Sequence, residues 1–325
     1  MLKIAVDLNG GDKSPSNIIK GVQLALKLGY IKPEELLLAG TGETVAFAQK
    51  NKKIGGLSFL ICPEKIEMSD DKEQIRKKKN STIVGGIKLL KNTNEGVGAF
   101  VSAGNTGAMV LWGTIILGRI KRGLQPAIAV PLPNERGPCL LLDSGAIHNA
   151  QAADLVNCAL MGSTYAREIW KLERPIIKLL NIGKESGKGN DTLKLADELL
   201  KQQSDLNYQG NIEGDKIFTE QVNVIVCPGE IGNNTIKVAE GVMKFIKDKL
   251  GFIWKIFSFL YGHHKKTDYE EIGGAILLGV DGILIIAHGK SQPLAVANAI
   301  RRAKMEITAD ILSKIKNEII TAEEP

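Results

Sequence analysis

Five short turns combine glycine with small polar side chains, the composition of loops that bind phosphate. They are VDLNGGD (6–12), SAGNTGA (102–108), LNIGKESGKGN (180–190), CPGEIGNN (227–234) and AHGKS (287–291). Glycine lets backbone N–H groups approach a ligand, and hydroxyl or amide side chains add further hydrogen-bonding groups. A single turn of this kind could equally cap a helix, whereas five together favour a ligand site.

The turn at 102–108 has the strongest phosphate-binding pattern. Gly104 and Gly107 permit close backbone approach, and Ser102, Asn105 and Thr106 offer polar groups just before a helix begins. Because a helix N-terminus carries partial positive charge, we expect a phosphate to bind there.

Two further features could add charge to such a site. The run IRKKKNST (75–82) places Arg76 among four cations, which could clamp phosphate or hold an acidic carrier protein, or could form a solvated loop. His288 follows the apolar run ILIIA, where it could be a positioned imidazole or a structural residue. The pair His263 and His264 lies in a basic stretch typical of a solvated loop.

The segment 245–266 is unusual in composition, since FIWKIFSFLY (252–261) holds five of the sixteen aromatic residues of the chain. Aromatic residues beside lysines are typical of a segment that lies on a membrane surface without spanning it. A dimer interface would also favour aromatic residues. We expect a membrane contact through a set of five side chains: Phe252, Trp254, Phe257, Phe259 and Tyr261.

Short apolar runs predict the strands that position these turns. They are 3–7, 35–40, 58–62, 97–102, 137–143, 176–182, 222–227 and 282–287. Helical spacing of apolar residues occurs between them at 15–28, 82–90, 154–170, 191–203, 234–250 and 293–319. The pattern predicts an α/β fold with a mostly parallel sheet between two layers of helices. With no linker, residues 1–325 are expected to form a single domain, with two lobes as an open possibility.

Composition excludes several classes of protein. The 42 basic and 36 acidic residues give a net charge of +6, with 24% charged and 44% hydrophobic residues, which fits a globular chain rather than a disordered or fibrous one. The charge is too small and dispersed to predict nucleic-acid binding. Four scattered cysteines predict neither a metal site nor disulfides. Without a signal peptide or a spanning run, we expect a cytoplasmic protein at a membrane surface.

Taken together, the turns resemble those of the phosphate:acyl-carrier-protein acyltransferases of the PlsX type. The resemblance runs from Ile4 to about Ile300. The stretches that carry it are AVDLNGGD, RKKKNST, SAGNTGAM, LLLDSGA, LLNIGKESGKGN, VIVCPGEIGNNTIK and GGAILLGVDGILIIAHG.

This resemblance implies a three-layer α/β/α sandwich similar to that of the isocitrate and isopropylmalate dehydrogenases. It also implies a homodimer that needs no cofactor and transfers an acyl group from acyl carrier protein (ACP) to inorganic phosphate, the first step of phospholipid synthesis. A peripheral membrane location is implied, with the product passed to a membrane glycerol-phosphate acyltransferase.

For this reaction we expect two groups of site residues. The expected catalytic residues are Asp7, Asn105, Lys188 and His288. The expected substrate-binding residues are Gly10, Gly11, Asp12, Arg76, Ser102, Gly104, Thr106, Gly107, Asn181, Gly183, Gly189, Asn190, Gly229, Gly232 and Asn233.

Two other functions stay open at this point. A short-chain phosphotransacetylase acting on acyl-CoA would use similar turns with soluble substrates. A non-catalytic scaffold that binds acyl carrier or membrane is suggested by departures from the family pattern at Asn9, Ile147, Pro228 and Glu230.

Overall fold

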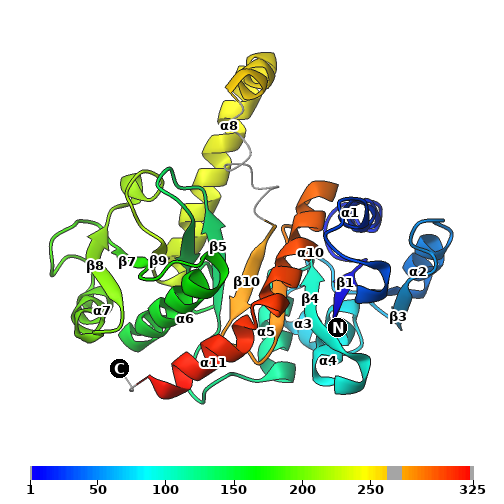
Figure 1. The fold of residues 1–325 in the computed structure, drawn as a ribbon, viewed down its shortest axis with the longest axis horizontal. Helices are drawn as coiled ribbons and strands as arrows, with labels where there is room; N and C mark the ends of the chain where they lie inside the picture. Colours follow the sequence, from blue (N-terminus) through cyan, green and yellow to red (C-terminus); the bar gives the residue numbers. More distant parts are fainter. Residues whose placement is uncertain (1, 262–272, 323–325) are drawn as a thin grey trace. The chain divides into compact units, whose positions relative to one another are not determined.

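The computed structural model describes residues 2–261 and 273–322, and within these it does not describe the side chains at 93, 247 and 252–261. The chain forms two compact units. Unit 1 comprises Met1–Pro126 and Ile272–Lys316, and unit 2 comprises Ala127–Glu271 and Asn317–Pro325. Each unit has its own strands and its own helices (Figure 1).

The sheet of unit 1 has the strand order β3-β2-β1-β4-β11-β10, in which only β10 runs antiparallel to its neighbour. Its central strands are almost wholly buried and apolar, as expected for strands covered on both faces. The strands are β1 (Lys3–Asp7), β2 (Leu36–Thr41), β3 (Ser58–Cys62), β4 (Val97–Ser102), β10 (Ala275–Leu278) and β11 (Ile283–Ile286).

Helices cover both faces of this sheet. On one face α1 (Ser16–Lys27) packs against α10 (Pro293–Thr308). On the other, α4 (Thr82–Lys91) packs against α5 (Thr106–Leu117), and α5 also contacts α3 (Lys72–Lys77). The remaining elements are α2 (Gly42–Gln49), η1 (Pro33–Glu35) and η2 (Thr93–Glu95).

Unit 2 has the strand order β5-β6-β9-β7-β8, in which β5 is antiparallel to β6 and the other pairs are parallel. Helices α6 and α7 pack against each other, while Ile236 of α8 packs on a buried cluster that includes Leu141 and Ile225. Its strands are β5 (Ala127–Leu132), β6 (Cys139–Leu142), β7 (Ile176–Leu180), β8 (Asn207–Ile212) and β9 (Val224–Val226). Its helices are α6 (Ala152–Trp170), α7 (Asp191–Gln202), η3 (Gly214–Lys216) and α8 (Gly229–Tyr261).

The parallel strands determine where the turns lie, because the carboxyl ends of parallel strands meet at one edge of a sheet. The turns after β1, β4 and β11 therefore share an edge in unit 1, and those after β6, β7 and β9 share an edge in unit 2. The predicted α/β fold with a mostly parallel sheet is confirmed.

Some predicted elements differ from the structure. The single helix expected at 293–319 is wrong: α10 ends at Thr308 and α11 (Ile311–Thr321) begins after Asp310, whose φ of 50° breaks the helix. Strands β5, β8 and β10 were not predicted. The short polar sequence of β8, NYQGNI, carries no continuous apolar run.

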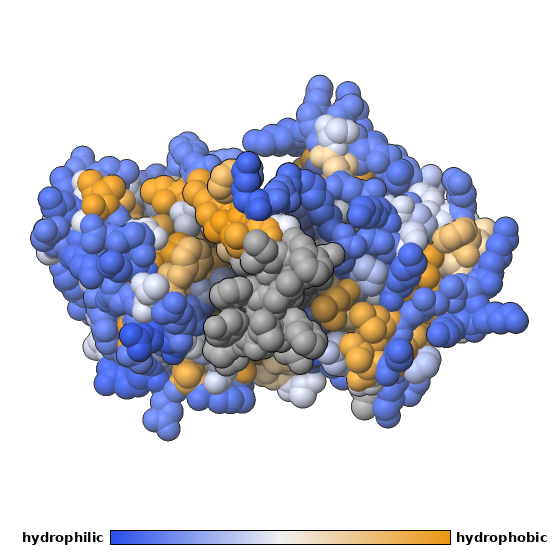
Figure 2. All heavy atoms as spheres, turned by 90° about the horizontal axis from the view of Figure 1, so that it is seen from above, coloured by the Kyte–Doolittle hydropathy of each residue, from blue (hydrophilic) through white to orange (hydrophobic). Residues whose placement is uncertain are grey.

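Within the described residues no helix combines the length and apolar composition that crossing a bilayer requires. The aromatic side chains expected to contact a membrane, Phe252, Trp254, Phe257, Phe259 and Tyr261, lie outside the described side chains. Elsewhere, exposed large hydrophobic residues are distributed over several elements. Figure 2 accordingly shows a face that is mainly hydrophilic, with hydrophobic residues in separate patches.

Candidate functional site

Three of the five predicted turns come together in unit 1, and glycines permit their contact. A Cβ on Gly10 would lie 2.7 Å from the backbone nitrogen of Gly104, so no larger residue fits between the first two turns. A Cβ on Gly11, whose φ is +92°, would lie 2.8 Å from the Gly289 carbonyl oxygen. The Asp12 backbone N–H donates to that same oxygen at 2.8 Å. We name these three segments, 6–12, 102–108 and 287–291, the turn cluster.

The first two turns are locked by a buried carboxylate. The Ser102 hydroxyl donates to Asp7 Oδ2 at 2.7 Å and accepts the Gly104 N–H at 3.0 Å, while the Asn9 N–H donates to Asp7 Oδ1 at 3.0 Å. Burial raises the pKa of Asp7, and the hydrogen bonds from Ser102 and Asn9 oppose that rise. Because its proton is already donated, Ser102 positions the turn rather than offering a hydrogen to a ligand.

The second predicted polar residue of the turn 102–108, Asn105, is the N-cap of α5. Its Oδ1 accepts the Ala108 N–H at 3.0 Å, and its Nδ2 lies 3.3 to 3.4 Å from three carbonyl oxygens of the segment 67–70. Both side-chain polar atoms therefore hold neighbouring backbone. Thr106 and Gly107 are exposed residues in the first turn of α5. Their backbone amides have no hydrogen-bond acceptor within the helix. These amides can bind an anion.

The basic run beside α5 contains both paired and unpaired cations. Lys78 forms an ion pair with Asp70 at 2.5 Å, and Lys77 lies 3.9 Å from Glu73. The side chains of Arg76 and Lys79 are exposed and form no ion pair with any residue that the structure describes. These two cations are free to meet a negatively charged ligand or protein.

His288 follows β11 and is half-buried. Its Nδ1 accepts the Lys290 N–H at 3.1 Å, so Nδ1 carries no hydrogen.

In unit 2 the glycine loop 181–190 is held by two buried asparagines. The Asn181 Nδ2 donates to the Lys188 carbonyl at 3.0 Å and to Asn211 Oδ1 at 3.2 Å, while Asn211 Nδ2 donates to the Glu185 carbonyl at 3.0 Å. A Cβ on Gly189 would lie 2.6 Å from Asn181 Oδ1, and its φ of +88° also requires glycine. The predicted residues Asn181 and Gly189 therefore shape the loop.

Two lysines of this loop differ in their surroundings. Lys184 lies 3.3 Å from Glu220, which also pairs with Lys178. Lys188 is exposed and forms no ion pair within the described part of the chain. The aliphatic part of Lys188 packs close to Gly183, because a Cβ there would lie 3.2 Å from Lys188 Cγ. Lys188 is thus the available cation of the loop, and Asn190 serves as the N-cap of α7.

The tip of the same loop is bound to α7 through Asp197. The Asp197 carboxylate accepts hydrogen bonds from Ser186 at 2.8 Å, from Lys201 at 2.6 Å and from Tyr208 at 2.7 Å. Burial tends to raise the pKa of Asp197, but the bonds from Lys201, Tyr208 and Ser186 outweigh it and lower the pKa. The sequence does not predict this anchor, because Asp197, Lys201 and Tyr208 lie outside the glycine motif.

The second group in unit 2 surrounds Asp143, directly after β6. Its carboxylate accepts the N–H groups of Ile128 at 2.7 Å, Ala146 at 2.8 Å and Ile147 at 2.7 Å. Burial raises the pKa of Asp143 against these bonds. The start of α8 packs here, since a Cβ on Gly229 would lie 2.4 Å from Asp143 Oδ2.

Gly232 and Asn233, the other two predicted site residues of the turn 227–234, lie beside the same turn after β6. A Cβ on Gly232 would lie 2.0 Å from the Asp143 carbonyl oxygen, and Asn233 lies near Gly145. The LLLDSGA motif was the sequence signal for Asp143, although that residue was not among the expected site residues.

The predicted residues are thus divided between the units. Unit 1 holds Asp7, Asn105, His288 and Arg76 with the glycines and polar residues of the turn cluster, and unit 2 holds Lys188 with the residues of its two turns. No cluster of three or more His, Cys, Asp or Glu side chains suited to a metal ion occurs among the described residues.

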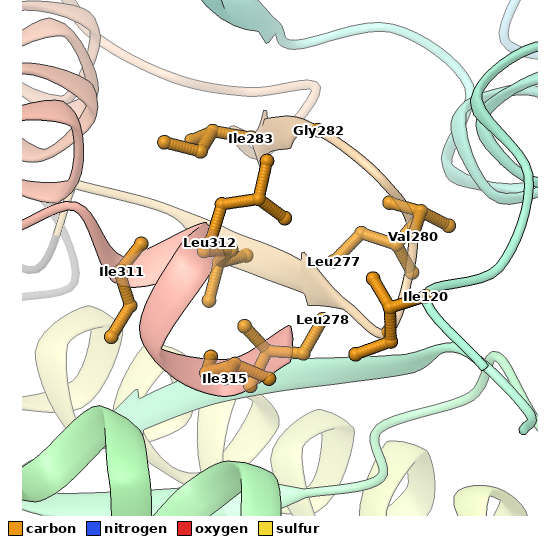
Figure 3. A pocket seen from close by; sticks show the side chains of 11 residues that line it. Ile120, Leu277, Leu278, Val280, Gly282, Ile283, Ile311, Leu312 and Ile315 are labelled. Carbon is orange, nitrogen blue, oxygen red and sulfur yellow. The ribbon is translucent and has the colours of Figure 1, made fainter. Parts of the chain in front are cut away.

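A separate pocket in unit 1 lies between β10, β11 and α11, at the end of β11 remote from His288. Figure 3 shows apolar side chains gathered around it, among them Leu277, Val280, Leu312 and Ile315. Its lining contains no polar side chain. It offers nothing to bind phosphate, so the turn cluster is the better candidate site.

The chain is similar in sequence to proteins of one known family. The family model described as "Fatty acid synthesis protein" matches residues 2–314. A protein of Thermoanaerobacter pseudethanolicus named "Phosphate acyltransferase" is 40% identical over 331 aligned positions, covering 98% of this chain and 97% of the relative. A second protein of that name, from Caldicellulosiruptor saccharolyticus, is 37% identical and covers 99% of both chains.

Solved structures are similar in fold. The EutD phosphotransacetylase from Staphylococcus aureus superposes with a TM-score of 0.58 at 16% identity, and a phosphotransacetylase from Streptococcus pyogenes with 0.59 at 18% identity. Each pairing covers 94% of both chains. These likenesses confirm the predicted three-layer fold.

Proposed function

This chain belongs to the fatty acid synthesis protein family, and on that premise we propose that it transfers an acyl group from acyl-ACP to inorganic phosphate. The family resemblance predicted from the sequence is confirmed by the match over residues 2–314. Relatives that are 37% and 40% identical over nearly the whole chain carry the name phosphate acyltransferase, which supports acyl transfer to phosphate.

One observation gives the main support for phosphate binding: hydrogen bonds hold the start of α5 beside the other turns. The Asp7 and Ser102 hydrogen bonds fix the turn, and Asn105 caps the helix, so the Thr106 and Gly107 amides have a fixed direction. Donors that are already oriented bind a dianion without the cost of reorganising.

In the proposed reaction a phosphate oxygen attacks the thioester carbonyl carbon. The new C–O bond forms as the C–S bond breaks, and the sulfur leaves as a thiolate that takes a proton from solvent. The products are acyl phosphate and free carrier thiol. The protein has to hold the dianion in line and stabilise the negative charge on the carbonyl oxygen.

We assign two charged or polar side chains to these tasks. Lys188 binds a negatively charged group of the substrates, since it is the unpaired lysine of its loop within the described residues, whereas Lys184 is held by Glu220. His288 is assigned to the reacting carbonyl oxygen, a role supported by its place directly after β11 in the turn cluster. Asp7, Ser102 and Asn105 act as positioning residues.

The carrier protein is proposed to contact the basic segment before α4. Arg76 and Lys79 are exposed without ion pairs to other described residues, and they suit an acidic partner. For the membrane, the aromatic residues between 252 and 261 and the neighbouring lysines support a peripheral contact. Flotation with anionic liposomes tests that contact, and light scattering tests the proposed homodimer.

The decisive assay measures acyl phosphate made from palmitoyl-ACP and inorganic phosphate, trapped with hydroxylamine, with palmitoyl-CoA in parallel. Product from the ACP thioester and little from the CoA thioester supports the proposal. Product chiefly from the CoA thioester would show that acyl-CoA is the acyl donor. No product from either thioester would overturn the proposed function.

Lysine variants of one loop test the site. Lys188→Ala should raise the KM for phosphate by about tenfold or more, as expected for a lost charge-assisted contact. Lys184→Ala is the matched control, because it removes an equal charge from the same loop and should leave the KM for phosphate within about twofold. Equal effects of both variants would argue against a specific role for Lys188.

A further inference from the structure

Met68 is an exposed hydrophobic side chain in contact with the turn cluster. It occupies the second position of a turn closed by the Asp70 N–H, which donates to the Glu67 carbonyl at 3.2 Å. Polar residues, glycine and proline prevail at such positions, whereas methionine normally fills gaps in a core. Met68 instead keeps 43% of its surface exposed.

The methyl end of Met68 lies against Gly289. A Cβ on Gly289 would be 2.8 Å from Met68 Cε and 3.7 Å from Met68 Sδ, so the glycine leaves the space that the methionine uses. The same point is 3.6 Å from Asp12 Oδ1. An apolar group is therefore held beside the polar turns of the site.

Contacts on both sides of Met68 hold its backbone in place. Asn105 Nδ2 lies 3.3 Å from the Met68 carbonyl oxygen, and Lys78 holds the end of the turn through Asp70. The Glu67 N–H also donates to Asp70 Oδ2 at 2.8 Å. Asn105 thus links the N-terminus of α5, where the anion is expected, to the backbone that carries Met68.

We propose that Met68 contacts the acyl chain of the donor and contributes to the affinity for acylated over unacylated carrier. The inference rests on the proposed function, because an acyl phosphate is half anion and half hydrocarbon. A site that joins these halves needs an apolar surface next to its phosphate donors. The flexible thioether of methionine suits a chain of variable length and conformation.

The test measures binding of palmitoyl-ACP and of unacylated ACP to the full chain without phosphate, so that no transfer occurs. Met68→Gln keeps the length of the side chain but makes it polar. It should raise the Kd for palmitoyl-ACP about tenfold, which corresponds to the loss of roughly one to two methylene contacts. The Kd for unacylated ACP should stay unchanged. Met68→Leu should restore most of the affinity for palmitoyl-ACP.

Met305→Gln is the matched control, since Met305 is 46% exposed on α10 and forms no part of the turn cluster. An unchanged Kd of Met68→Gln for palmitoyl-ACP would overturn the inference, and so would an equal loss for both forms of the carrier. Because binding is measured without turnover, a wild-type protein that binds as expected but makes no acyl phosphate would refute the proposed function alone.

Discussion

The hydroxyl of Ser102 donates a 2.7 Å hydrogen bond to the carboxylate of Asp7 and thereby joins the ends of two adjacent parallel strands. The two residues are 95 positions apart in the sequence, and both are 1% exposed. This bond fixes the direction of the turn that precedes α5.

Replacing Ser102 tests that link. Ser102→Ala leaves a buried carboxylate oxygen and the Gly104 N–H without their partner, so the free energy of unfolding should fall by about 1–3 kcal/mol. Urea denaturation measures the loss, and the KM for phosphate should rise as well. Ser58→Ala, at an exposed position of β3, should change neither quantity.

The buried Asp7 carboxyl predicts an unusual dependence of stability on pH. Because burial raises its pKa above the usual 3.8, the native state binds the Asp7 proton more tightly than the unfolded state. Its contribution to stability is therefore greatest below pH 3.8 and declines as pH rises through the raised pKa. The free energy of unfolding of wild type minus that of Asp7→Asn should decrease over this range, and a difference that increases would contradict the assignment.

Gly10 tests the close approach of the turns. In Gly10→Ala the added Cβ would meet the Gly104 nitrogen at 2.7 Å, and backbone on both sides must move. Such overpacking costs about 1–3 kcal/mol, and the displaced turn should also raise the KM for phosphate. Gly56→Ala is the control, because no atom lies within 4 Å of its Cβ position. If the two variants behave alike, the contact is unimportant.

The anchor of the loop in unit 2 should respond to pH in the opposite direction. Although burial raises it, the pKa of Asp197 is lowered overall by Lys201, Tyr208 and Ser186. Its ionised form stabilises the native state above the unfolded pKa near 3.8, and the contribution is lost as pH falls through the lowered value. Asp197→Asn should cost about 1.5–3 kcal/mol at neutral pH and progressively less in acid. A cost independent of pH would exclude the ion pair as its cause.

A buried ion pair on α10 provides a stability test away from the site. Arg302 Nε donates to Glu306 Oε1 at 2.9 Å, and Arg302 also donates to the Gly274 carbonyl. Glu306→Ala removes the charged acceptor from a buried ion pair and should cost about 3–5 kcal/mol. Glu73→Ala breaks an exposed pair of the same spacing with Lys77 and should cost about 0.3–0.5 kcal/mol. Comparable losses would show that burial does not set the cost.

Apolar runs in the sequence predicted eight of the strands. The bounds expected for β1, β3 and β4 agree with the structure, because each run ends at a small or polar residue. β10 was not predicted, although its sequence AILL is apolar, and its antiparallel pairing with β11 depends on the intervening turn. The break at Asp310 depends on one backbone angle, which hydrophobic spacing does not encode.

For the site, composition predicted which turns would matter but not how their atoms are used. Asn105 was expected to face a ligand, yet its side chain holds the segment that carries Met68. Met68, Asn211 and Asp197 were not predicted, since each acts through a partner brought close only by the fold. Long-range contacts of this kind leave no local pattern.

The place of β11 in its sheet also has a consequence for synthesis on the ribosome. β11 pairs with β4, although 180 residues lie between them in the sequence, and the ribosome makes all of these before β11. Most of unit 2 therefore emerges while β4 still has an unpaired edge, and such an edge readily pairs with other chains. Completion of unit 1 must await residues 272–316, so the edge of β4 stays open to pairing with other chains during that part of synthesis.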